Sequence, residues 1–141
     1  MKNLLKKSTT AVVILSLFAV SCKKADIALD NIPAANALET SVTWVPKGST
    51  TPITTSGDIK NGDVGVPYKI NPTLSGDFAK CGGTWSLTVD APPNAQYAAP
   101  FSAAKGYVTF TPLTAGTYKL KLTYKCPCGT SISITITITV S

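Results

Sequence analysis

The chain contains no histidine and no arginine, so every basic residue is a lysine. Without histidine, the Ser-His and Cys-His pairs that activate most catalytic nucleophiles cannot form, and the commonest ligand of catalytic zinc is missing. Two carboxylates can hydrolyse a glycoside, but Asp77 and Asp90 are dispersed singly, and a domain this small rarely supplies the cleft. The sequence therefore predicts a protein that is not an enzyme and that carries no cofactor and no metal.

Positive charge is also scarcer in the body of the chain than the formal net charge of +6 suggests. Five of the thirteen lysines lie within residues 2–24, and setting them aside leaves a net charge of +1. Binding to nucleic acid depends on several lysines or arginines that neutralise phosphates. We therefore expect no nucleic-acid partner.

Residues 1–21 have the layout of a secretory signal peptide. Lysines stand near the start, an apolar run extends from Ala11 to Val20, and small Ser21 comes directly before Cys22. The apolar run is too short to cross a bilayer as a permanent helix. We expect this segment to be a cleavable export signal.

The residues Ala19-Val20-Ser21-Cys22 resemble a bacterial lipobox, with Ala19 where leucine is usual. The resemblance implies that Cys22 becomes the new N-terminus and carries acyl chains such as palmitate, which attach the protein to a membrane. The Cys-Lys-Lys start resembles lipoproteins of the Bacteroidetes group, which implies the outer membrane or cell surface, with the periplasmic face open as an alternative. An ordinary signal peptide cleaved near Ser21, or an N-terminal membrane anchor, is the other interpretation.

Residues 22–39 are polar and small, with neither strand alternation nor an amphipathic stripe, and we interpret them as a tether after the lipidated cysteine. Residues 40–141 are then one domain of ordinary size. Short apolar runs separated by Gly, Pro, Asn and Asp indicate an all-β class. The expected strands are Ser41–Val45, Ile53–Ile59, Val66–Leu74, Gly83–Val89, Tyr107–Thr111, Thr117–Lys125 and Ser131–Val140.

The last two expected strands show the clearest pattern. Apolar residues and Cys126 occupy the even positions from Tyr118 onward, and Thr or Lys occupies the odd ones. Ile alternates with Ser or Thr from Ser131 to Val140, and the short Cys-Pro-Cys-Gly turn joins the two segments. The pattern predicts a hairpin with one face in the core and one face in water.

The segments Val64 to Tyr68, GGTWSLTVDAPPNAQY and GYVTFTPLTAGTYKLKLTY are similar to the immunoglobulin-like, cadherin-like repeat of bacterial surface proteins. The similarity spans Val64 to Val140 and implies an antiparallel β-sandwich of about seven strands. In that fold Trp85 belongs to the core, and the Tyr118 hydroxyl returns to nearby backbone as in a tyrosine corner.

The same resemblance implies a disulfide. In an immunoglobulin-like sandwich the strand that begins after Cys81 lies beside the end of the strand at Cys126, so Cys81 is expected to pair with Cys126 or Cys128. One thiol would be left over. The functional alternative is a metal or redox site with three thiolates, whose fourth ligand could not be histidine.

The expected export signal, lipid anchor and fold together predict a non-catalytic binding or adhesion module of the cell envelope, which presents loops to a glycan or an envelope protein. Amide and aromatic side chains near the Pro-Pro turn suit such contacts, and the candidates are Asn94, Gln96 and Tyr97. A simpler interpretation makes Tyr97 a packing residue beside a strand. The alternative function is a structural or accessory subunit of an envelope protein complex.

Overall fold

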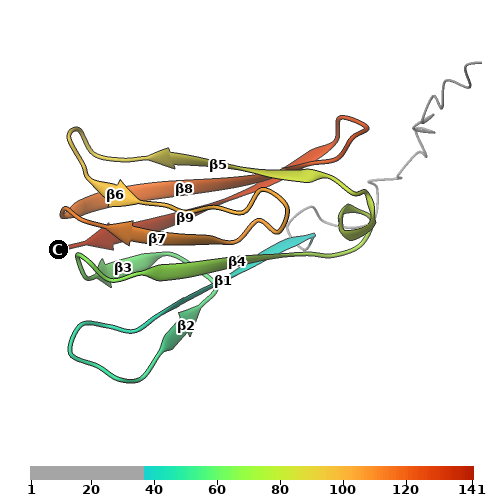
Figure 1. The fold of residues 1–141 in the computed structure, drawn as a ribbon. Helices are drawn as coiled ribbons and strands as arrows, with labels where there is room; N and C mark the ends of the chain where they lie inside the picture. Colours follow the sequence, from blue (N-terminus) through green and yellow to red (C-terminus); the bar gives the residue numbers. More distant parts are fainter. Residues whose placement is uncertain (1–36) are drawn as a thin grey trace, which may run out of the picture.

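The computed structural model describes residues 37–141, which form an all-β domain of two open sheets packed face to face (Figure 1). The expected β-sandwich is confirmed. Each sheet is built from strands that are apolar on one side, and burying those sides against each other stabilises the pair.

The larger sheet has five strands in the order β2-β1-β4-β7-β6, with antiparallel pairing throughout. Its strands are β1 (Leu38–Trp44), β2 (Ile53–Thr55), β4 (Tyr68–Leu74), β6 (Tyr97–Ala98) and β7 (Val108–Pro112).

The smaller sheet has four strands in the order β3-β9-β8-β5, and only β3 runs parallel to its neighbour β9. Its strands are β3 (Ile59–Gly62), β5 (Thr84–Asp90), β8 (Gly116–Lys125) and β9 (Ser131–Val140). The hairpin of β8 and β9 agrees with the sequence pattern to within a residue, because strict alternation fixes both the face and the register.

The core lies between the sheets and contains the residues that the alternation assigned to it. On β8, Tyr118, Leu120 and Leu122 are fully buried. Trp85 of β5 is buried as expected and lies against Tyr124, with ring centroids 4.9 Å apart. Gly106 packs on the face of this indole with a φ of +78°, where any Cβ would collide with the ring. The core therefore needs glycine at this position.

The structure differs from the expected strands in the middle of the chain. The expected strand Ile53–Ile59 is divided between β2 and β3, which belong to different sheets, because the chain crosses from one sheet to the other at 56–58. The short β6 is a further strand, and β1 begins at Leu38, before the expected domain start at residue 40. The described domain thus contains nine strands rather than about seven.

The two ends of the sandwich differ in content (Figure 1). One end, which we call the disulfide end, holds Ala37, the 3₁₀ helix η2 (Phe78–Lys80) and the β8–β9 turn. The opposite end, which we call the loop end, holds the C-terminus and the connections 63–67, 91–96 and 113–115. The described part of the chain therefore begins, at Ala37, at the disulfide end.

Candidate functional site

The loop end brings together the residues that the sequence singled out for binding. The connection 91–96 crosses from β5 in one sheet to β6 in the other, and Asn94, Gln96 and Tyr97 are all exposed along it. Asn94 has a positive φ of 61°, and the Ala95 N–H donates to the Pro92 carbonyl at 3.0 Å. Asparagine tolerates this left-handed conformation better than most residues, which explains its place in the turn.

Backbone hydrogen bonds hold this connection against the β7–β8 turn. The Gln96 N–H donates to Thr114 Oγ1 at 3.2 Å, and the Leu113 N–H donates to the Gln96 carbonyl at 2.8 Å. Both the N–H and the carbonyl of Gln96 are therefore hydrogen-bonded, which holds the backbone in place. The Gln96 side chain is exposed to solvent.

Tyr97 combines packing with exposure. Its ring lies 5.7 Å from that of Phe110 and 6.0 Å from that of Tyr118, measured between centroids. Its side chain nevertheless remains 39% exposed. Tyr97 therefore closes the border between the two sheets, as the simpler interpretation expects, and only the remaining part of its ring is open to a ligand.

Leu113 belongs to the same surface and was not predicted from the sequence. It is 50% exposed, the largest value among the exposed large hydrophobic side chains of the described domain. A single leucine in the turn Pro-Leu-Thr-Ala-Gly has no periodic partner, so no pattern assigned it to a face. The loop-end surface, defined here as Asn94, Gln96, Tyr97 and Leu113, thus offers two amides and two apolar side chains. Such groups can bind a ligand through hydrogen bonds and contact, without proton transfer.

The hydroxyls of two buried tyrosines stabilise the loop end from below. Tyr118 donates to the Thr114 carbonyl at 2.7 Å, which confirms the expected return of this hydroxyl to nearby backbone. The hydroxyl of Tyr68 accepts from the Asp63 N–H at 2.7 Å. Burial raises the pKa of the Tyr68 phenol above its ordinary value; the hydrogen bond from the Asp63 backbone lowers it, and the negative charge of Asp63 raises it. The hydrogen bonds of both hydroxyls therefore hold the backbone of these two turns in place.

At the disulfide end, Cys81 is bonded to Cys126 with a Cα–Cα distance of 5.6 Å. The structure thus selects Cys126 of the two expected partners. No cysteine within residues 37–141 is free, Cys128 included, so the expected leftover thiol is not found. The disulfide also occupies two of the sulfurs that a three-thiolate site would need, and no group of three metal-binding side chains occurs in the described domain.

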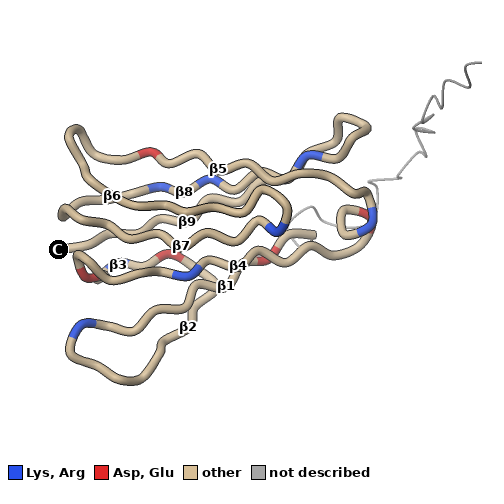
Figure 2. Tube along the Cα trace, in the orientation of Figure 1, with Lys and Arg blue, Asp and Glu red and all other residues tan. Residues whose placement is uncertain are grey.

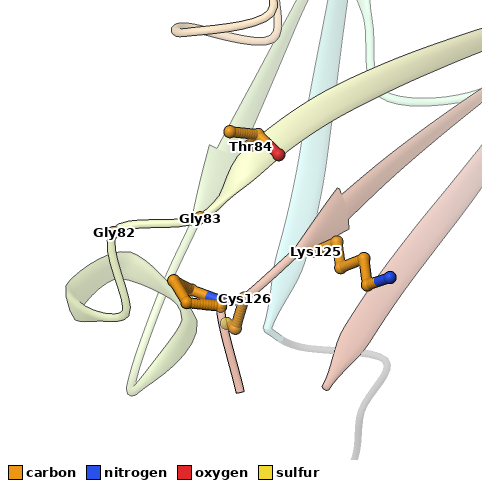
Figure 3. Close-up of a pocket in the computed structure, with 6 residues that line it drawn as sticks. Gly82, Gly83, Thr84, Lys125 and Cys126 are labelled. Atoms are coloured by element: carbon orange, nitrogen blue, oxygen red, sulfur yellow. The ribbon is translucent and has the colours of Figure 1, made fainter. Parts of the chain in front are cut away.

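A shallow depression of about 250 Å³ lies beside this disulfide (Figure 3). Backbone and small side chains form most of its wall, and the lining residues are Gly82, Gly83, Thr84, Lys125, Cys126 and Pro127. The Lys125 side chain points away from the two glycines (Figure 3). The Gly83 N–H is already bonded to the Tyr124 hydroxyl at 2.7 Å. The depression therefore presents few polar groups that converge on a ligand.

The outer face of β8 carries Lys119, Lys121 and Lys125, all exposed. The facing outer positions of β5 and β9 are Ser or Thr, apart from Asp90 opposite Lys119. Charges elsewhere on the domain are spread along the trace, and an acidic and a basic segment adjoin at η2 (Figure 2). This face has the composition of a solvated sheet surface.

Cys22 and the expected export signal lie outside the described residues. In the part of the chain that the structure covers, no helix is long and apolar enough to span a bilayer. Comparison of the chain with protein-family models gives no match, and comparison with curated proteins gives none either.

Proposed function

We propose that this chain is a non-catalytic lipoprotein of the bacterial cell envelope, whose immunoglobulin-like sandwich presents the loop-end surface to a glycan or a protein. The single observation that carries the proposal is the placement of the two ends. The chain enters the domain at Ala37 at the disulfide end, and the loop-end surface lies at the opposite end (Figure 1). A domain held through its N-terminal side would therefore direct these loops away from the membrane.

The anchor in this proposal is a lipid on Cys22. Attached acyl chains contribute about 0.8 kcal/mol per buried methylene, and two or more chains hold a protein durably on a bilayer. The outer membrane or cell surface is the proposed location. Residues 23–36 then supply the reach between membrane and domain, at most about 50 Å when fully extended.

Lipidation is tested by expressing the full chain with and without Cys22→Ser and feeding the cells an alkyne-labelled fatty acid. We expect label and membrane fractionation for the native chain and neither for the variant. A mature N-terminal peptide in which the Cys22 sulfur is unmodified, or joined to another cysteine, would overturn the lipid anchor.

Binding at the loop end is tested by placing a photo-crosslinking amino acid at Gln96 on intact cells. The matched control places the same group at Lys80, which is exposed at the disulfide end. We expect extracellular glycan or a protein from outside the cell to be captured at position 96 and not at position 80.

The second candidate function is an accessory subunit of an envelope complex. A specific feature favours it, because β5 is an open strand edge that a partner could extend. Reproducible capture of one resident envelope complex from the same crosslinking group placed at Thr88 on β5, with nothing captured from position 96, would replace the binding module by this subunit.

A further inference from the structure

The strand edge of β5 has backbone groups that the domain itself does not use. β5 is the outermost strand of the smaller sheet and pairs only with β8 (Figure 1). The Trp85 N–H donates to the Ala103 carbonyl at 3.0 Å, so it points away from β8. In a regular antiparallel strand alternate residues point the same way. The N–H and C=O groups of Leu87 and Val89 therefore also point outward, and neither N–H has a hydrogen-bond partner among the described residues.

The outermost strands at the other three sheet edges of the described domain are short or irregular, and β3 pairs with β9 only from Ile138 to Val140. β2 has three residues, β6 has two, and the pairing of β3 with β9 contains a register shift. The Asp58 side chain accepts the N–H of Thr137 at 2.7 Å, which closes part of the β3 side. Natural sheets commonly protect their edges in such ways.

β5 lacks these protections. Its seven residues pair with β8 without a shift, and the strand contains no proline and no lysine. Its one charged residue is Asp90, at the end of the strand (Figure 2). Leu87 and Val89 are only partly buried, so apolar surface remains open along the same edge.

We propose that the β5 edge pairs with the β5 edge of a second copy of this chain. A two-fold axis through Thr88 sets Leu87 of each copy opposite Val89 of the other. Their N–H and C=O groups then exchange hydrogen bonds, and their half-buried side chains meet on the core side. On the outer side Ser86 stands opposite Asp90 of the second copy, so no carboxylate faces another.

The small size of this edge limits the strength of the pair. A seam between two such short segments buries less than the roughly 1,200 Å² of a stable interface, so we expect a weak and transient dimer in solution. Tethering can compensate for this weakness, because copies held in the narrow gap between two facing surfaces have a high effective concentration.

The antiparallel seam also orients the two copies. It points the disulfide end of one copy, with Ala37, opposite to that of the other. If the chain is anchored as proposed above, on which this step rests, the pair fits copies held on two facing surfaces. The seam itself does not depend on the anchor.

The seam is tested on residues 22–141 with Cys22→Ser, since the nine described strands and the core that they bury lie within residues 37–141. We expect sedimentation equilibrium to show dimers between micromolar and millimolar concentration. The amide resonances of Leu87 and Val89 should shift with concentration. The variant Val89→Pro removes an N–H that has no partner within one copy, so the domain should still fold and the dissociation constant should rise at least tenfold.

The matched control Val89→Ala keeps the N–H and should still dimerise, and Leu87→Pro is a second variant should Val89→Pro fail to fold. A native protein that stays monomeric at millimolar concentration, or dimers that persist in both proline variants, would overturn the seam. Vesicles carrying the chain through an N-terminal tag should cluster with the native protein and not with Val89→Pro. Dimers in solution without clustering would overturn only the facing-surface arrangement.

Discussion

Cys81 and Cys126 join the segment before β5 to the end of β8, two neighbouring strands whose ladder runs from Thr84 and Lys125 to Asp90 and Lys119. The bond closes a loop with a sequence separation of 45 residues. The bond therefore holds the start of β5 against the end of β8.

We expect the double variant Cys81→Ala/Cys126→Ala to lose on the order of 4 kcal/mol of unfolding free energy, because the open chain regains the entropy of a loop of this length. Urea unfolding of the oxidised native protein and of the double variant measures the difference. Equal midpoints and slopes for the two proteins would show that the bond contributes nothing.

Thr40→Val should stabilise the domain. The Thr40 side chain is 5% exposed and its hydroxyl has no hydrogen-bond partner among residues 37–141, so folding removes its water without replacement. Removing such a group recovers a penalty of roughly 1–3 kcal/mol. Thr43→Val on the same strand is the control, since the Thr43 hydroxyl is bonded to that of Thr54 at 2.9 Å. The midpoint temperature of thermal unfolding should rise for Thr40→Val and not for Thr43→Val.

Tyr97→Ala separates packing from binding at the loop end. Loss of two ring pairs, each worth about 0.5–1.5 kcal/mol, should lower the unfolding free energy. Gln96→Ala should leave stability unchanged, because only the backbone of Gln96 is bonded. If Tyr97→Ala unfolds like the native protein, its ring does not close the sheet border as described.

Stability should fall at alkaline pH through Tyr68. Burial raises the pKa of this phenol in the folded state, so the unfolded chain releases the proton first as the pH rises. The contribution is complete below the unfolded value of about 10 and is lost as the pH rises toward the folded value. Denaturant unfolding across this range should show a steep decline in the native protein and a shallower one in Tyr68→Phe. Parallel curves would assign the decline to other groups.

The parts of the fold that were predictable are those where one local pattern decides. Alternation defined β9 from Ser131 to Val140 and placed Tyr118 in the core. The division of Ile53–Ile59 between two sheets could not be predicted, because an apolar residue at each end of a short polar segment fits one strand as well as two. The local composition does not say which sheet each end joins.

The candidate site was predictable only in part. The exposure of Asn94 and Gln96 follows from their place after two prolines in a turn. Leu113 was missed because exposure of a leucine depends on what covers it, which is a property of the assembled sandwich. Tyr97 is partly packed and partly exposed for the same reason. Its ring lies against Phe110 of the larger sheet and Tyr118 of the smaller sheet, and this contact exists only in the assembled fold.

The route of the chain through β1 determines how the domain would carry tension. A load applied between Ala37 and the loop-end surface runs along β1, which pairs with β4 from Leu38 to Thr43. The hydrogen bonds of an antiparallel ladder lie perpendicular to the strands. Such a load shears these bonds together instead of peeling them apart one at a time, so the sheet resists extension best when the domain is pulled from Ala37.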